Sequence, residues 1–243
     1  MNNIPLVSVI MSAYNSENYI AESIESITKQ SYKNIEFLII DDNSEDNTSE
    51  VIKKYEKSDK RIKFISNSKN IGLTKSLNKA IMLSQGKVIA RQDDDDISLP
   101  NRLEAQVKHI HSGSYDVCFA RATNMQNSKP MPRYSFYLPP RLVVKYKNPF
   151  IHGSMVIKKE ILKMVGNYNE NYYYSQDYYL FKRLLENRVK IKYIKEELYL
   201  LNTKNNISSN FREEQNYYAQ CVQRNIEPDI GRDWYENIYR RTF

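Results

Sequence analysis

The sequence predicts an α/β protein whose mostly parallel sheet is flanked by helices on both faces. Short apolar runs, such as residues 6–11 and 35–40, are rich in β-branched residues and alternate with amphipathic stretches of helical length. The runs are apolar throughout, which is typical of strands buried in a parallel sheet. A chain of 243 residues is long enough for one such domain, alone or with an appendage.

Four strand-and-helix units make up the first half of the chain. Strands are expected at residues 6–11, 35–40, 62–65 and 88–90, and the helices carry apolar residues within 20–27, 51–55, 73–84 and 99–110. Ser16 is a candidate cap for the first helix, and Asp46 or Thr48 for the second. Gly86 is expected to end the third helix. Four such units in succession predict parallel strands.

The second half is less regular and predicts a mixed sheet. We expect a strand at 115–122, an edge or mixed strand at 151–157, a helix at 160–165 ended by Gly166, a helix opening at Gln176 and Asp177, and closing strands at 189–194 and 198–201. The pattern after Asn210 is helical. These elements predict one domain over 1–210, divided into halves at 1–122 and 123–210, with a helical C-terminal extension at 211–243.

Polar residues at three expected strand ends predict a common ligand site. Residues 12–15, 41–44 and 93–96 each follow a strand, and parallel strands bring their carboxyl ends to one edge of the sheet. The four carboxylates from Asp93 to Asp96 repel one another, so they favour a hard divalent cation with oxygen ligands. A solvated acidic loop is the alternative, because most acidic runs are of that kind.

Composition narrows the functional classes. No apolar run is long enough to cross a bilayer and residues 1–5 do not resemble a secretory signal, so a cytoplasmic location is expected. Cys118 and Cys221 lack metal-type spacing, which argues against a zinc site or a disulfide framework. The sequence has neither a G-x-G-x-x-G nor a Walker pattern, so a bound phosphate would need a metal or basic side chains.

The net charge of +7 is concentrated in one segment. Residues 129–163 contain eight basic residues and a single acid, Glu160, together with several aromatic residues. Such a mixture can bind nucleic acid, anionic lipid headgroups or a phosphorylated acceptor. An ordinary lysine-rich surface is the alternative, since lysine is frequent throughout the chain.

Five stretches together resemble glycosyltransferase family 2. They are VSVIMSAYNSENYIAESIESITKQSYKNIEFLIIDDNSED, NIGLTKSLNKAI, GKVIARQDDDDISLPNRLEAQ, HGSMVIKKEILKMVGNYNE and SQDYYLFKRLLE, in the family's order. The resemblance implies an inverting enzyme of the Rossmann-like GT-A fold that uses a nucleotide-sugar donor. It places the nucleotide-sugar site in residues 1–122 and the acceptor site in residues 123–210.

The resemblance also implies roles for individual residues. It places Ser12, Ala13, Tyr14, Asn15, Asp41, Asp42, Asn70, Gly72, Lys75, Asp93 and Asp94 in the nucleotide-sugar site. Asp42 would accept the imide hydrogen bond of the base. Asp95 matches the direct metal ligand, with Asp93 beside it and His152 as a further candidate, so Mn²⁺ or Mg²⁺ is the expected cofactor. Asp177 matches the catalytic base.

Two of these residues have structural alternatives, and one region departs from the family pattern. An acid at a helix start, such as Asp177, often caps the helix, and His152 could be a structural histidine on an edge strand. Gln176 stands where the family often has Glu. After the last strand, where members often have Arg and His, this chain has Leu201 and Thr203, and Lys204 is a candidate substitute. The departure concerns the third metal ligand and the phosphate clamp.

The expected function is transfer of a sugar from a nucleotide-diphosphate sugar, with UDP-sugar as the first choice, to a hydroxyl of a glycan or lipid-linked acceptor in bacterial surface polysaccharide or glycan assembly. The basic segment 129–163 and the tail after Asn210 are expected to contact an anionic membrane at its inner face. Three alternatives remain: a sugar nucleotidyltransferase, a family member with impaired catalysis, and a nucleic-acid-binding module, although no nucleic-acid partner is expected for a transferase.

Overall fold

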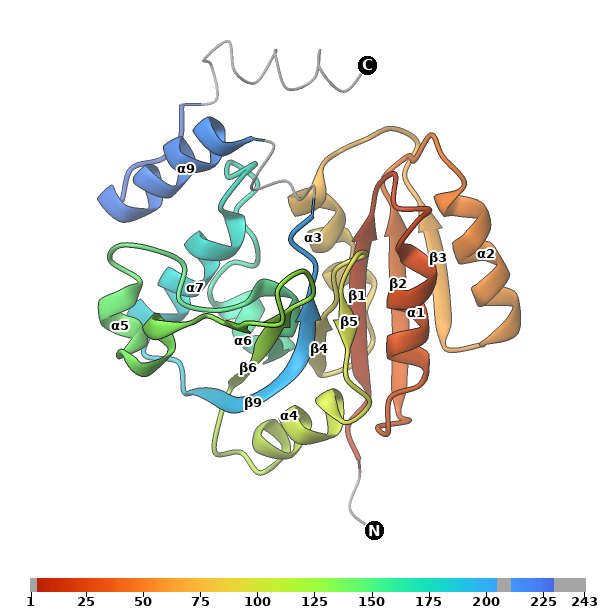
Figure 1. Ribbon diagram of the computed structural model, residues 1–243, viewed down its shortest axis with the longest axis horizontal. Coiled ribbons are helices and arrows are strands. Elements are labelled where there is room, and N and C mark those ends of the chain that lie inside the picture. The colour runs from red at the N-terminus through yellow and green to blue at the C-terminus, as the bar shows by residue number, and fades with distance from the viewer. Residues whose placement is uncertain (1–3, 205–210, 230–243) are drawn as a thin grey trace.

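A nine-stranded curled sheet organises the protein, with helices on both of its faces (Figure 1). The computed structural model describes residues 4–204 and 211–229. Its strands are β1 (Val7–Ala13), β2 (Ile35–Asp41), β3 (Ile62–Ser66), β4 (Val88–Arg91), β5 (Ile97–Ser98), β6 (Val117–Asn124), β7 (Pro130–Met131), β8 (Val156–Lys158) and β9 (Ile191–Leu201). The order is β3-β2-β1-β4-β8-β6-β9-β5, and β7 pairs with β6.

Helices cover both faces of the sheet and enclose two cores. They are α1 (Ile20–Thr28), α2 (Thr48–Ser58), α3 (Leu73–Leu83), α4 (Arg102–His111), α5 (Pro140–Val143), α6 (Lys159–Met164), α7 (Gln176–Glu186) and α9 (Arg212–Arg224), with 3-10 turns η1 (Tyr134–Tyr137) and η2 (His152–Ser154). One core packs α1, α2 and α4 on the sheet, and the other packs α3, α6, α7 and α9. Across the described residues, no helix combines the length and apolarity that a membrane crossing needs.

The first half of the sheet is parallel, as the sequence predicts. β3, β2, β1 and β4 are neighbours and all run in the same direction. Every residue of β1 and β2 is buried, which explains why their sequences are apolar runs without alternation. The four strands therefore deliver the residues that follow them to one edge.

The second half is mixed, but two of its elements differ from the prediction. β8 begins only at Val156 and lies between β4 and β6, antiparallel to both, so the segment 151–157 does not form an edge strand. The closing strands at 189–194 and 198–201 are one strand, β9, whose register with β6 shifts around Arg121. The exposed pair Lys195 and Glu196 interrupts the apolar pattern there, and this interruption resembles a loop in the sequence.

Helix ends follow the sequence signals only in part. Asp46 accepts a hydrogen bond from the Thr48 backbone nitrogen at the start of α2, at 3.0 Å, and Gly166 follows α6 with φ +84°. The Ser16 side chain does not cap α1, which begins four residues later without a side-chain cap. Gly86 does not end α3, which stops at Leu83. Its role is close packing, because a Cβ there would lie 2.6 Å from the backbone oxygen of Leu6.

Candidate functional site

The loops after β1 and β2 are joined by the side chain and backbone of Asn15. This residue has φ +50°, a conformation that Asn tolerates better than most residues. Its backbone nitrogen donates to Oγ of Ser44 at 3.0 Å, and its side-chain oxygen accepts from the Glu45 nitrogen at 2.8 Å. Asn15 therefore fixes the relative position of two of the predicted site segments.

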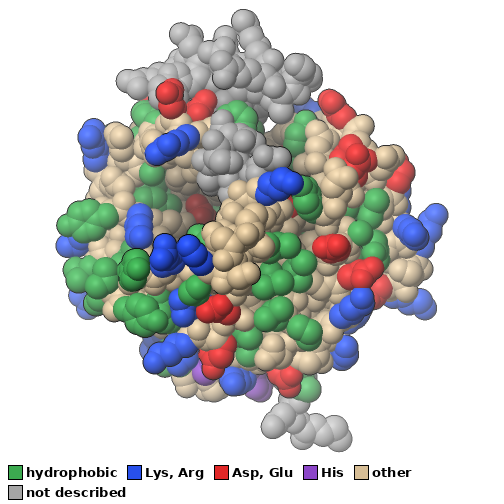
Figure 2. Space-filling model, in the orientation of Figure 1, with side chains coloured by type: hydrophobic (Ala, Val, Ile, Leu, Met, Phe, Trp, Pro, Cys, Tyr) green, Lys and Arg blue, Asp and Glu red, His purple; other side chains and the backbone are tan. Residues whose placement is uncertain are grey.

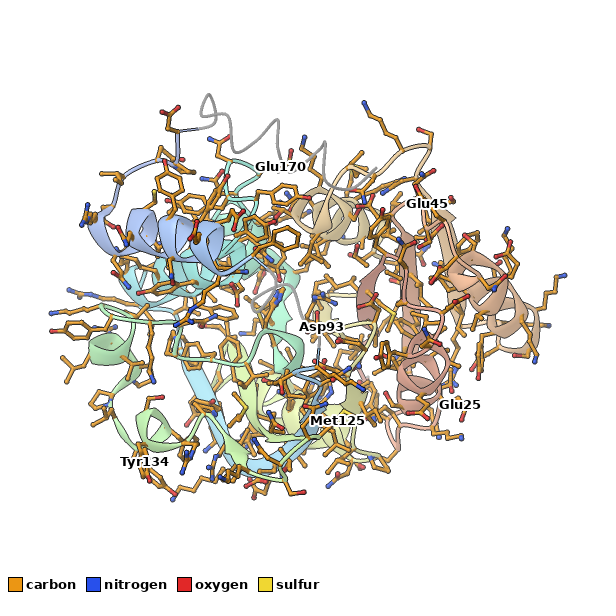
Figure 3. All side chains as sticks on the ribbon, turned by 45° about the horizontal axis from the view of Figure 1, so that its top comes forward. Glu25, Glu45, Asp93, Met125, Tyr134 and Glu170 are labelled. Atoms are coloured by element: carbon orange, nitrogen blue, oxygen red, sulfur yellow. The ribbon has the colours of Figure 1, made fainter. Side chains whose placement is uncertain are left out.

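The end of β1 also contacts the acidic run. Ser12 and Ala13 are buried at the end of the strand. The backbone nitrogen of Tyr14, the next residue, donates to Oδ2 of Asp94 at 3.3 Å. The three predicted strand ends thus meet at one edge of the sheet, where Asp93 lies between the two halves of the molecule (Figure 3).

Asp41 and Asp42 are both buried and have different partners. Asp41 accepts hydrogen bonds from Ser44 and Ser49, which orders its own loop. Asp42 accepts from Asn67 at 2.7 Å and from the backbone nitrogens of residues 71 and 72 at 2.9 and 2.8 Å. A carboxylate offers about four acceptor positions, so these three donors leave one on Asp42 for a ligand.

The loop before α3 brings Asn70, Gly72 and Lys75 to the same edge. Asn70 accepts a hydrogen bond from the Gly72 nitrogen at 3.1 Å. Gly72 has φ +87°, and a Cβ there would lie 3.0 Å from the Tyr173 ring, so the position suits glycine. Lys75 lies in the first turn of α3, half-buried, and its ammonium group makes no hydrogen bond or ion pair with the described residues. The donor loop therefore carries an uncommitted cation.

The acidic run forms a turn whose four carboxylates have different surroundings. Asp93 forms an ion pair with the buried Arg91. Burial, followed by repulsion from the neighbouring carboxylates, raises the pKa of Asp94 to about 6 and that of Asp95 to about 7. Asp96 is buried and accepts from the Asn202 nitrogen at 2.6 Å. The run is half-buried or buried, so it is not a solvated acidic loop.

The expected metal ligands were compared with the charges at this turn. Among residues 4–204 and 211–229, no three His, Cys, Asp or Glu side chains are grouped to hold a metal ion. Asp95 and Asp94 nevertheless repel each other's charge without a basic partner of their own in an ion pair of the described chain. Carboxylate oxygens suit Mg²⁺ and Mn²⁺, so the turn fits a cation that takes its other ligands from water or substrate.

The turn η2 brings the second half of the chain against Asp93. A Cβ on Gly153 would lie 2.6 Å from Oδ2 of Asp93 and 2.0 Å from the Tyr199 hydroxyl, so only glycine fits. The neighbouring His152 has Nε2 at 2.7 Å from the Tyr168 hydroxyl. Burial, followed by the charge of Arg91, lowers the pKa of His152 and favours a neutral imidazole. His152 thus belongs to a 3-10 turn at the site and not to an edge strand.

Asp177 opens α7 on the same side of η2. Its Oδ1 accepts from the Tyr178 backbone nitrogen at 2.8 Å, and its Oδ2 accepts from the side-chain amide of Asn148 at 2.5 Å. Phe181 lies one turn further on α7, and its ring contacts that of His152 with the centroids 6.2 Å apart. Asp177 is therefore held in a fixed orientation, half-buried, on the helix face that approaches η2.

The family of the chain follows from comparison with known proteins. The model of glycosyl transferase family 2 matches residues 8–188. The chain belongs to glycosyl transferase family 2. This glycosyltransferase is 37% identical over 228 residues to an uncharacterized glycosyltransferase of Methanocaldococcus jannaschii, covering 88% of this chain and 77% of the relative. It is 32% identical to the UDP-Glc:alpha-D-GlcNAc-diphosphoundecaprenol beta-1,3-glucosyltransferase WfgD of Escherichia coli, over 74% and 70% of the two chains.

Solved structures confirm that the glycosyltransferase has the GT-A fold. S. aureus TarS in complex with UDP-GlcNAc matches with a TM-score of 0.70 at 22% identity, over 82% of this chain and 59% of the TarS chain. The mannosyltransferase PcManGT of Pyrobaculum calidifontis, in complex with GDP-Man and Mn²⁺, matches with a TM-score of 0.69 at 17% identity, over 88% and 61%. At these identities the likeness concerns the fold, and this chain spans about three fifths of each structure.

Sequence reasoning missed the buried groups that hold the glycosyltransferase's acidic turn. Arg102, fully buried, donates to the backbone oxygens of Gly153 at 3.0 Å and Arg91 at 3.1 Å, and it lies over the Tyr199 ring. The Tyr199 hydroxyl accepts from the Asp93 nitrogen at 3.1 Å. A charged residue inside an apolar strand, as Arg91 is in VIAR, was the available signal, because such a charge needs a buried partner.

The segment after β9 shows what replaces the family's usual residues in this glycosyltransferase. Leu201 ends the strand, and the Thr203 hydroxyl contacts Gln126 at 2.7 Å. Asn202 between them connects the segment to Asp96 through its backbone nitrogen. Lys204 is exposed and is the last described residue before 205–210. The tail positions of the expected membrane contact at 205–210 and 230–243 lie outside the described residues.

Proposed function

We propose that this glycosyltransferase moves a sugar from a nucleoside-diphosphate sugar, with UDP-sugar as the first candidate, to a hydroxyl of a glycan or lipid-linked acceptor, with inversion at the anomeric carbon. One observation carries the proposal. The turn η2 touches Asp93 through Gly153 and touches α7, which bears Asp177, through His152. A donor-side carboxylate and an acceptor-side carboxylate therefore flank the same turn, as direct displacement between two substrates requires.

The donor would lie along the edge formed by the loops after β1, β2 and β3. The free acceptor position on Asp42 suits the imide N–H of uracil, because the other three positions are already occupied. Ser12 to Asn15 and Asn70 would border the nucleoside, and Lys75 supplies a charge for phosphate. The relative WfgD has UDP-Glc in its name and TarS was solved with UDP-GlcNAc, which supports a UDP-sugar.

Asp177 would act as the general base. Its carboxylate takes the proton of the acceptor hydroxyl as that oxygen bonds to the anomeric carbon and the bond to the nucleoside diphosphate breaks on the opposite side. The amide of Asn148 and the Tyr178 nitrogen hold the carboxylate in place, which contributes through orientation. Attack opposite to the leaving group gives the inverted anomer.

Asp95 and Asp93 are the residues that would hold Mn²⁺ or Mg²⁺, with His152 beside them. A bound cation stabilises the charge that develops on the departing diphosphate, an effect on the order of several kcal/mol. The GDP-Man complex of PcManGT contains Mn²⁺, which supports a cation in this fold. Arg91 holds Asp93 in position, and Tyr14 contacts Asp94 through its backbone.

The setting we infer is bacterial surface polysaccharide or glycan assembly at the inner face of the membrane. The relative WfgD is named for transfer to a diphosphoundecaprenol-linked sugar, and the 34% identical TuaG of Bacillus subtilis for teichuronic acid biosynthesis. A lipid-linked acceptor of this kind would bring the enzyme to a membrane surface.

The deciding experiment combines donor binding with product analysis. A thermal-shift panel of UDP-, GDP- and CDP-sugars with and without Mn²⁺ should show the largest stabilisation with one donor and the metal. NMR of the product formed with that donor should show an anomeric configuration opposite to that of the donor. Donor binding without turnover on any acceptor would indicate an impaired family member, and retained configuration would refute inversion.

A further inference from the structure

The segment 133–147, which we call the basic aromatic surface, combines exposed rings with unpaired positive charge. It comprises η1, α5 and the residues around them, at the outer end of the second half of the chain (Figures 1 and 2). Tyr134, Tyr137 and Tyr146 are 77%, 75% and 77% exposed. Such exposure of three large aromatic residues within fourteen positions is unusual, because apolar patches of this kind mark binding sites.

The structure confines the positive charge of the wider segment 129–163 to this surface. Lys158 is paired with Asp116 at 2.8 Å, and Lys159 donates to the Ser84 backbone oxygen at 2.6 Å. Arg141, Lys145 and Lys147, by contrast, are exposed and form no ion pair with the described residues. No Asp or Glu occurs between positions 116 and 160. The surface is therefore cationic and aromatic, without local neutralisation.

We propose that the basic aromatic surface docks on an anionic lipid membrane. Tyrosine rings are favoured at the level of lipid headgroups, where the ring is partly apolar and the hydroxyl remains wet. Lys and Arg side chains add attraction to anionic headgroups, and this attraction weakens with salt. The leucines of the same segment, Leu138 and Leu142, are also exposed, at 55% and 53%, and supply an apolar contact between the charges. Charge complementarity thus selects an anionic surface as the occupant.

The basic aromatic surface is attached directly to the helix that carries the candidate base. The Val144 backbone oxygen accepts from the Tyr178 hydroxyl at 2.7 Å. Asn148, which follows the surface, donates to Asp177. A membrane that contacts this surface would bring a lipid-linked acceptor close to the start of α7. This consequence for the acceptor rests on the proposed function, whereas membrane binding itself does not.

Vesicle flotation of the full chain tests the proposal. We expect binding to vesicles that contain phosphatidylglycerol, little binding to pure phosphatidylcholine vesicles, and loss of binding at high salt. The triple variant Arg141→Ser/Lys145→Ser/Lys147→Ser should bind phosphatidylglycerol vesicles at least about tenfold more weakly. The variant Tyr134→Ser/Tyr137→Ser/Tyr146→Ser should weaken binding and leave its salt dependence in place.

The matched control removes three exposed lysines from α2, at the opposite end of the molecule (Figure 1). The variant Lys53→Ser/Lys54→Ser/Lys57→Ser changes the net charge equally and should bind as the parent does. Equal loss in both charge variants, or absence of binding by the parent, would overturn the proposal. Thermal stabilisation by the nucleotide sugar should be the same in all variants, so a failure of the membrane proposal is distinguishable from a failure of the proposed function. Self-association that the tyrosine variant abolishes, without vesicle binding by the parent, would instead indicate a second copy as the partner.

Discussion

The side-chain amide of Asn148 donates a 2.5 Å hydrogen bond to Oδ2 of Asp177, and these residues come from a loop and a helix 29 positions apart. With the Tyr178 nitrogen on Oδ1, this contact fixes both oxygens of the carboxylate. A base held in this way can lose activity by two separate routes, through removal of its charge or through loss of its orientation.

Asp177→Asn is expected to remove the base and preserve the fold. The amide has the same shape as the carboxylate but cannot take the acceptor proton, so kcat should fall by about 10²- to 10⁴-fold. Thermal stabilisation by the nucleotide sugar should remain, since the donor site lies on other loops. Equal loss of turnover and donor binding would show that Asp177 acts as a structural cap.

Asn148→Ala is expected to affect orientation alone. Without the amide, the carboxylate keeps its charge but loses one of its two fixed contacts, and kcat should fall by about tenfold to hundredfold. Steady-state kinetics should show this change in kcat with the KM for the donor unchanged. A rise in donor KM at constant kcat would contradict a role through Asp177.

Asp95→Ala should abolish the metal dependence of donor binding. Asp95 lies at the turn of the acidic run, where its charge is repelled by Asp94 and Asp93, so a cation relieves that repulsion. Titration of the sugar nucleotide should show tighter binding with Mn²⁺ than with EDTA in the parent, and no such difference in the variant. Glu45→Ala provides a control on an exposed acid of the neighbouring loop. Donor affinity that EDTA leaves unchanged in the parent would refute the metal.

Arg91 and Asp93 are expected to contribute jointly to the free energy of unfolding. Arg91→Met leaves the carboxylate without its buried partner and should cost about 3–5 kcal/mol. Tyr199→Phe removes only one neutral hydrogen bond and should cost about 1 kcal/mol. In urea denaturation, Arg91→Met combined with Asp93→Asn should be less unstable than the sum of the single variants. Additive costs would show that the two charges are not coupled.

Local sequence patterns predicted the parallel half of the sheet and the location of the site. Strand ends can be read from apolar runs, so the meeting of residues 12–15, 41–44 and 93–96 followed from the rule for parallel sheets. The start of α7 at Gln176 was recognisable for a similar local reason. Family membership then confirmed what the motifs resembled.

The contacts that hold the site could not be predicted, because they join residues that are distant in sequence. Arg102 reaches Gly153, and Tyr199 reaches Asp93, across 51 and 106 positions. β9 was read as two strands because Lys195 and Glu196 face solvent at its irregular centre. Periodicity reports which face of an element is apolar and carries no information about the partner of a buried charge.

Glu36 gives a prediction for the pH dependence of stability that is independent of the active site. This residue is 5% exposed in the middle of β2 and accepts hydrogen bonds from Ser8 at 2.6 Å, from Lys63 at 2.6 Å and from the backbone nitrogen of Gln85 at 2.5 Å. Burial opposes its ionisation, but these donors outweigh burial and lower its pKa below the ordinary value of 4.5. The ionised form is therefore favoured by folding.

The sign of the effect follows from the lowered pKa. The contribution of Glu36 is fully present above pH 4.5 and is lost as the pH falls through the lower pKa of the folded state. Glu36→Gln should cost about 1–3 kcal/mol near neutral pH and should flatten the fall in stability below pH 4.5. Glu50→Gln, at an exposed surface pair, should change neither quantity measurably. Urea denaturation at a series of pH values measures both effects, and parallel curves for the parent and Glu36→Gln would show that the buried carboxylate is not the group that titrates.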